Sequence, residues 1–137
     1  MIDGDTIELA DGRMVRYIGM DAPEVHRRAR PGDHEWRGGD GARWVLDPEP
    51  FGDAATEANR RLVEGKPVRL EYDAQTHDRF GRLLAYVYLG ETMVNAELVA
   101  QGLAQPLTIP PNVRYAERFQ ALSRQAREQG RGLWANL

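Results

Sequence analysis

Two stretches of the chain alternate apolar and polar side chains with the two-residue period of half-buried β-strands, and each is followed by a run rich in β-forming residues. In the first stretch the two runs are separated by Asp11-Gly12, a pair typical of a tight hairpin turn. The second stretch leads to an apolar run long enough to be a central strand. The four predicted strands are residues 6–9, 14–18, 68–72 and 83–89.

Apolar side chains three or four positions apart indicate helices in three other stretches. Asp53 can cap the first of these helices, and Gly65 ends it. Gly102 closes a short second helix, and Gly130 ends a third helix that carries a clear apolar stripe. The predicted helices begin at Asp53, Asn95 and Tyr115.

The segment between the first hairpin and the first helix has no sustained period. Residues 25–50 are rich in Arg, Gly, Pro and Asp, which predicts a long inserted loop. The resulting order is two strands, loop, helix, two strands, short helix and long helix. This order favours a small antiparallel barrel carrying helices over a parallel βαβ sheet. We interpret residues 1–137 as a single domain.

Composition narrows the class of protein. With 42% hydrophobic and 28% charged residues among 137, the chain resembles soluble globular domains rather than disordered or fibrous chains. It has no Cys and three scattered His, so disulfides and zinc centres are disfavoured and any metal is expected to be held by oxygen. No apolar run approaches the ~18 residues of a membrane-spanning helix, and the first residues do not resemble a signal peptide.

Charge gives a mixed indication of nucleic-acid binding. The net charge of -3 argues against binding by bulk charge alone. All basic residues except Lys66 are arginines, which suit bidentate phosphate contacts, although the base composition of the genome explains the same bias. Arginines and tryptophans of the 25–50 segment either follow a nucleic-acid strand or belong to a solvated loop. They are Arg27, Arg28, Arg30, Arg37, Arg43, Trp36 and Trp44.

Four acidic residues lie near the open end of the predicted hairpin: Asp3, Asp5, Asp21 and Glu24. Pro23 stiffens the corner that carries Glu24. A hard cation such as calcium accepts carboxylate, carbonyl and water oxygens, and a neighbouring carboxylate can activate the attacking water. The alternative is that these aspartates are ordinary turn residues.

The strand register leaves one conflict in this prediction. With a two-residue turn, residues whose numbers sum to 23 pair, so Asp5 lies opposite Ile18 and Asp21 falls about 10 Å further along. The two aspartates then lie on opposite faces. A bulge at Gly19, or a strand that ends before Asp21, would remove the conflict.

A basic cluster occupies residues 77–82, where Arg82 begins the following strand. Arg16, on another strand, is its natural companion. Two arginines on one phosphoryl group would neutralise the charge that develops on its oxygens. Alternatively, these arginines are solvated or paired with Asp78 or Glu71.

Five strings of residues occur in a recognisable order. They are Ile2-Asp3-Gly4-Asp5-Thr6; Arg16 with Met20-Asp21-Ala22-Pro23-Glu24; Asp78-Arg79-Phe80-Gly81-Arg82; Met93-Val94-Asn95 with Leu98-Val99 and Gln101-Gly102-Leu103-Ala104; and Gly132-Leu133-Trp134. Together they resemble the staphylococcal-nuclease-like (thermonuclease) family over nearly the whole chain. Each string alone is weak, but five in order make coincidence remote.

The resemblance implies a mainly β fold, a five-stranded OB-fold barrel with three α-helices. It also implies a calcium-dependent phosphodiesterase that cleaves DNA and RNA to 3′-phosphate products. The residues that match the family's site are Asp5, Asp21 and Ala22 as calcium ligands, the last through its carbonyl; Glu24 as general base; Arg16 and Arg82 as contacts of the scissile phosphate and its transition state; and Arg79 and Phe80 as substrate contacts.

Two departures concern substrate binding. Phe80 replaces the family's usual tyrosine, so a hydroxyl is missing while ring stacking on a base remains available. Residues 106–111 lack the tyrosines that the family places against the nucleotide. The main alternative function is a non-catalytic OB-fold module that binds nucleic acid or a protein, and a structural barrel is a third. Because such modules usually lose the acidic and arginine set, its presence here favours the enzyme.

The N-terminus differs from the family as well. A complete strand precedes the Asp-Gly-Asp string in the family, whereas Met1 and Ile2 precede it here. We therefore expect a truncated first strand and a monomer able to self-associate through that part of the barrel. No membrane partner is expected. The resemblance implies export from the cell, but no signal peptide is present in this chain and a cytoplasmic location stays open.

Overall fold

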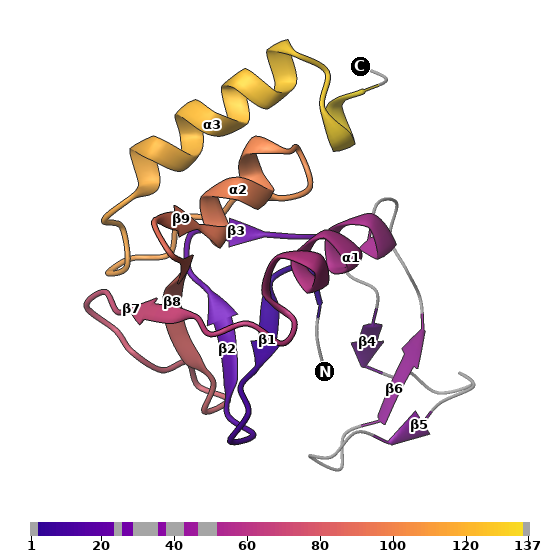
Figure 1. Cartoon of the computed structure of the whole chain (residues 1–137), viewed down its shortest axis with the longest axis vertical. Helices are drawn as coiled ribbons and strands as arrows, with labels where there is room; N and C mark the ends of the chain where they lie inside the picture. Colours follow the sequence, from indigo (N-terminus) through magenta and orange to yellow (C-terminus); the bar gives the residue numbers. More distant parts are fainter. Residues whose placement is uncertain (1–2, 24–25, 29–35, 38–42, 47–51, 136–137) are drawn as a thin grey trace.

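The computed structural model describes residues 3–23, 26–28, 36–37, 43–46 and 52–135. A mixed sheet with helices packed along one side forms the body of the molecule (Figure 1). Its pairs are antiparallel except for β2 and β8, which are parallel. The strand order is β1 (Thr6–Glu8), β2 (Met14–Tyr17), β8 (Leu83–Leu89) and β7 (Arg69–Glu71), with β9 (Thr92–Met93) paired to β8.

The central pair of strands builds the core. Val15 and Tyr17 of β2 lie opposite Leu83 and Ala85 of β8, and all four are buried. Burying a large apolar side chain stabilises the fold by about 1.5–3 kcal/mol, so this face fixes the pairing. Because successive side chains of a strand point to opposite faces, Arg16 projects away from this core.

Three α-helices lie among the described residues: α1 (Gly52–Val63), α2 (Val94–Ala100) and α3 (Ala116–Glu128), followed by the short 3-10 helix η1 (Gly132–Trp134). In Figure 1, α2 lies between the sheet and α3, and it contacts both. Phe119 of α3 is fully buried and its ring centroid is 6.3 Å from that of Tyr86 on β8. This contact anchors the C-terminal helix to the sheet.

The periodic elements were predicted to within a residue or two, but the hairpin register was not. Thr6 pairs with Arg16 and Ile7 with Val15, so paired residue numbers sum to 22 rather than 23. The backbone amide of Leu9 donates to the carbonyl of Arg13 (2.8 Å), which leaves a three-residue loop. Gly12, with φ +91°, takes the left-handed conformation that three-residue hairpin loops require.

The predicted loop at residues 25–50 contains three short strands. They form a separate antiparallel sheet in the order β4-β6-β5, drawn beside the main sheet in Figure 1. Strands of two to four residues are too short for alternation to be recognised in the sequence, which is why the loop prediction is wrong there. The strands are β4 (His26–Arg28), β5 (Trp36–Arg37) and β6 (Arg43–Leu46).

A mixed sheet with three helices agrees with the fold that the resemblance implies, but the described strands do not form a closed ring. The sheet ends at β1 on one side and β7 on the other. The parallel β2–β8 pair also departs from the expected antiparallel barrel. In the part of the chain described here, no helix combines the length and apolar character needed to cross a membrane.

Candidate active site

Two carboxylates meet on one guanidinium group at the end of the hairpin. The Nη2 atom of Arg16 lies 3.6 Å from Asp5 Oδ2 and 3.3 Å from Asp21 Oδ1. Nη1 of Arg16 donates to the backbone carbonyls of Tyr17 (2.8 Å) and Met20 (3.0 Å). The structure therefore brings Asp5, Asp21 and Arg16 together at the open end of the hairpin.

A turn after β2 removes the register conflict. β2 ends at Tyr17, and Asp21 belongs to a separate strand, β3 (Met20–Asp21), which pairs with β10 (Gln105–Pro106). Gly19 in the turn has φ +86°, and a Cβ there would lie 2.1 Å from the Phe119 ring. Only glycine fits this turn, which carries Asp21 back toward Asp5.

Asp5 is the more enclosed of the two acids. Its side chain is 13% exposed, whereas that of Asp21 is 56% exposed. Asp5 Oδ1 accepts a hydrogen bond from the Thr6 hydroxyl (3.0 Å), and Oδ2 accepts one from the backbone amide of Ala22 (3.3 Å). The three residues expected to hold a metal, Asp5, Asp21 and Ala22, are therefore neighbours.

The donors at this corner fit a hard divalent cation. The two carboxylates supply oxygen donors near one another, since Nη2 of Arg16 lies 3.6 Å from one and 3.3 Å from the other. Calcium prefers carboxylate, carbonyl and water oxygens, and it tolerates a loose, partly aqueous site. Among the described residues no group of three or more His, Cys, Asp or Glu side chains is placed to hold a metal, so any such ion would depend on few protein ligands.

Arg82 is held by a different carboxylate. Its Nε donates to Asp78 Oδ2 (2.7 Å), while Oδ1 of Asp78 accepts from the backbone amides of Phe80 and Arg82 (2.9 Å each). The pairing with Asp78, which the sequence left as an alternative, is thus present. It uses Nε, and neither Nη atom of Arg82 has a partner in the described part of the chain.

A cleft of about 420 Å³ is lined by Arg16 and Arg82, among other residues. Apolar side chains stand at its rim: Phe80 and Ile109 are each 62% exposed, and Leu107 is partly exposed. Two cations lie near the Phe80 ring, with Cζ of Arg79 4.9 Å and Cζ of Arg82 5.7 Å from its centroid. The cleft thus combines phosphate-binding groups with an exposed aromatic face.

Comparison with known proteins gives the family. Residues 14–136 match the family described as "Staphylococcal nuclease homologue". A thermonuclease from Staphylococcus hyicus is 37% identical to this chain, covering 99% of it and 73% of that protein. A thermonuclease from Staphylococcus intermedius is 34% identical, with 98% and 72% covered, and endonuclease YncB from Bacillus subtilis (strain 168) is 31% identical, with 98% and 58% covered. The chain belongs to the staphylococcal nuclease family.

One site residue of this family member cannot be placed. Glu24, the expected general base, lies outside the described residues, and so do Val25 and the side chains of the 26–51 segment. The arginines and tryptophans that either follow a nucleic-acid strand or belong to a solvated loop fall in that segment. Their role therefore stays a prediction.

Sequence reasoning missed the residues that hold the rim of the cleft in this member of the family. Asn112 is buried, accepts from the backbone amide of Gln75 and donates to its carbonyl (2.8 Å each). This reciprocal pair ties the segment carrying Leu107 and Ile109 to the 75–82 segment carrying Arg82. An asparagine in a proline-rich stretch gives no sequence signal for such a long-range contact.

Proposed function

We propose that this protein is a calcium-dependent nuclease that hydrolyses DNA and RNA to products with 3′-phosphate ends. The observation that carries the proposal concerns Arg16, which contacts Asp5 and Asp21 and also lines, with Arg82, the cleft described above. Relatives named thermonuclease and endonuclease support the same reaction class. The proposal includes a single OB-fold domain over residues 1–137.

The cation would be held by the carboxylates of Asp5 and Asp21 and by the carbonyl of Ala22. When bound, calcium supplies positive charge for a phosphate oxygen and for the attacking water. Arg16 then has a second role, because the Nη2 atom that contacts both carboxylates can also donate to a phosphate oxygen bound beside them. An exported location is part of the proposal, since millimolar calcium outside cells would fill a weak site.

Glu24, Arg16 and Arg82 have separate roles in the hydrolysis. Glu24 accepts a proton from the attacking water, whose oxygen forms a bond to phosphorus while the bond from phosphorus to the 5′-oxygen breaks. The leaving 5′-oxygen takes up a proton from solvent. Arg16 and Arg82 donate to the non-bridging oxygens, where negative charge increases in the five-coordinate transition state.

The rim of the cleft suits an unpaired base. Phe80 offers an exposed ring flanked by Arg79 and Arg82, and Ile109 offers an apolar contact. Stacking on an aromatic ring is tolerant of base identity because every base has a π-face. We therefore propose single-stranded DNA and RNA as substrates, bound without base-specific hydrogen bonds from these side chains.

The decisive experiment is digestion of labelled single-stranded DNA and RNA with calcium and then with excess chelator. Cleavage with calcium, loss of cleavage with chelator and 3′-phosphate ends are the expected results. Magnesium should substitute poorly, because its strict octahedral geometry and tightly held waters suit a loose site badly. Binding without cleavage in calcium would contradict the enzyme and favour the non-catalytic OB-fold module.

A variant tests the general base separately. Glu24→Gln should slow turnover on the order of 10²-fold or more while calcium affinity stays nearly unchanged, because the assigned partner of Glu24 is water. Calcium titration by calorimetry and single-turnover kinetics measure the two quantities. A variant that loses calcium first would make Glu24 a ligand instead.

A further inference from the structure

A fully buried asparagine on α1 contacts the turn that carries Asp5. Asn59 is 0% exposed, and its Nδ2 donates to the backbone carbonyls of Asp3 (2.7 Å) and Thr6 (3.4 Å). Its Oδ1 accepts a hydrogen bond from the hydroxyl of Tyr17. Every polar group of this side chain is therefore used, and each partner is far from Asn59 in the sequence.

These contacts hold both ends of one short turn. The backbone amide of Asp3 donates to the carbonyl of Thr6 (3.1 Å), which closes the turn around Gly4 and Asp5. Asn59 donates to both residues that close it, so one side chain fixes the turn from each end. The carbonyl of Asp5 accepts in addition from the amide of Tyr17 (2.9 Å), the residue whose hydroxyl holds Asn59.

Close packing leaves this turn little room to move. A Cβ at Gly4 would lie 2.8 Å from Cβ of Ala55 on α1 and 2.6 Å from Cβ of Ala22. The helix therefore presses the turn against Ala22, whose amide donates to Asp5. α1 thus contacts the backbone of the turn that carries Asp5, although none of the side chains of α1 lines the cleft.

The hydroxyl of Tyr17 donates to Oδ1 of Asn59 inside the core, where both side chains are buried. Asn59 keeps its amide orientation because Oδ1 has this donor and Nδ2 faces two carbonyls.

We propose that Asn59 is a positioning residue that sets the calcium affinity of the site by holding the Asp5 carboxylate in place. The inference rests on the proposed calcium site at Asp5 and Asp21. Residues that orient metal ligands typically change metal affinity by about 10–100-fold when removed. Asn59 acts through the backbone of the turn and does not touch the substrate.

The test compares calcium affinity in three variants by isothermal titration calorimetry, at a temperature where near-ultraviolet circular dichroism shows each to be folded. Asn59→Ala should weaken calcium binding at least about tenfold. Val63→Ala is the matched control, since Val63 lies one turn further along α1, is buried in the core and makes no contact with the turn by hydrogen bonds. It should lose stability but keep calcium affinity within about twofold, as expected for a site left intact.

Tyr17→Phe covers the case in which Asn59→Ala does not fold. This variant keeps the buried ring and removes the hydroxyl that orients Asn59, so it should show an intermediate loss of calcium affinity. Calcium affinity of Asn59→Ala equal to that of Val63→Ala would overturn the proposal, as would unchanged affinity in Tyr17→Phe when Asn59→Ala is unfolded. Absence of calcium binding by the unmodified protein would overturn the proposed function together with this inference.

Discussion

At the residue scale, the two arginines of the cleft differ in how they are held. Arg16 uses both Nη atoms on the carboxylates and carbonyls of the hairpin end, whereas Arg82 is held through Nε alone. Asp78 thus orients the guanidinium of Arg82, which lines the cleft, and leaves its Nη atoms without a hydrogen-bond partner among the described residues. A guanidinium fixed in this way costs little reorganisation when charge develops on a phosphate.

Arg82→Ala should therefore lower kcat on the order of 10²-fold or more, with a much smaller change in KM. The reason is that the guanidinium acts on charge present in the transition state. Steady-state kinetics on a single-stranded oligonucleotide measure both constants. Arg13→Ala is a matched control, because Arg13 also pairs through Nε with an aspartate, Asp11, at 2.7 Å, but in the exposed hairpin loop away from the cleft.

Phe80→Ala should show the opposite kinetic pattern. Loss of a stacking ring removes about 1–3 kcal/mol per base of binding free energy, so KM should rise roughly tenfold or more while kcat changes little. Phe80→Tyr, which keeps the ring, should retain the affinity of the unmodified protein. A fall in kcat with unchanged KM in Phe80→Ala would contradict the stacking role.

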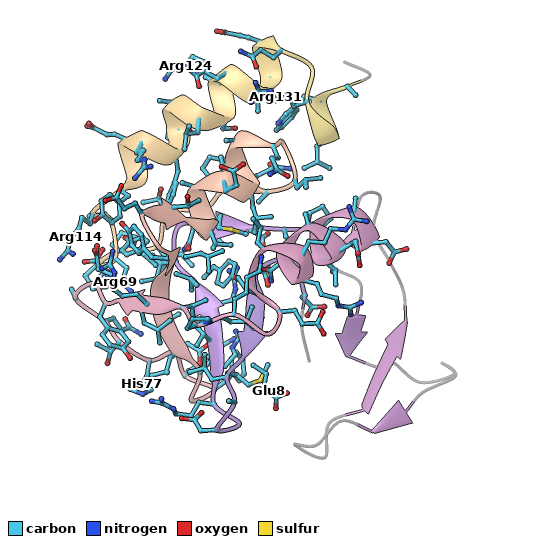
Figure 2. All side chains as sticks on the ribbon, in the orientation of Figure 1. Glu8, Arg69, His77, Arg114, Arg124 and Arg131 are labelled. Carbon is cyan, nitrogen blue, oxygen red and sulfur yellow. The ribbon has the colours of Figure 1, made fainter. Side chains whose placement is uncertain are left out.

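At the element scale, the start of α3 is fastened to the sheet by two acidic residues. Glu71 of β7 accepts from Arg114 (3.1 Å) and from the Tyr115 hydroxyl, and this bond raises the pKa of Tyr115 to about 12. Figure 2 shows Arg69 and Arg114 on the same side of the molecule, and both pair with Glu71. Asp73, just after β7, accepts from the Tyr86 hydroxyl (2.8 Å) and the Arg114 amide (3.1 Å).

Asp73 gives this connection a pH dependence. Burial alone would raise the pKa of its carboxyl, but hydrogen bonds from Tyr86 and from the amides of Arg114 and Ala74 hold it below the ordinary 3.8. A carboxyl whose pKa is lower in the folded than in the unfolded protein stabilises the fold fully at any pH above its unfolded-state pKa. This stabilisation is lost as the pH falls through the folded-state pKa.

Asp73→Asn should accordingly lower the free energy of unfolding at pH 7, because the hydrogen bonds lose a charged acceptor. The expected loss is only about 1 kcal/mol, because solvent screens a partly exposed carboxylate. The difference from the unmodified protein should shrink as the pH falls below 3.8. Urea unfolding at several pH values measures it. A difference that stays constant down to acid pH would show that the charge of Asp73 contributes nothing.

At the scale of the whole molecule, the described main sheet has two edges. β1 and β7 each pair with one neighbouring strand within the described residues. A groove of about 600 Å³ lies beside β1, lined by residues 7–10 and by residues 63–68 at the end of α1 and in the connection to β7. Apolar side chains that pack on the core line it, among them Ile7, Leu9, Val63 and Val68. The edge of a sheet beside apolar surface favours the addition of a further strand.

Adding about ten β-forming residues before Met1 should raise the melting temperature, because an extra strand can pair with these edges and cover the groove. The chain as printed should be a monomer that self-associates as its concentration rises. Thermal melts and light scattering of both lengths measure the effect. Equal melting temperatures, with a monomer at every concentration, would contradict it.

Elements whose burial pattern repeats over several residues could be predicted from the amino-acid sequence alone. β8 occupies the predicted residues 83–89, and α2 and α3 begin within one residue of the predicted Asn95 and Tyr115. The order of the five strings also determined the family, since residues 14–136 match it. The elements depend on a local period of burial, and the family depends on the order of local motifs; both can be read from neighbouring residues in the sequence.

Contacts between residues distant in the sequence could be seen only in the tertiary structure. Whether Asp5 meets Asp21 depended on a three-residue loop and on a turn at Gly19 that the Phe119 ring confines. The pairing of Asn59 with Asp3 spans 56 positions, and that of Asn112 with Gln75 spans 37. No local period encodes such contacts, because they form only when packed helices and strands bring a buried polar group to its partner.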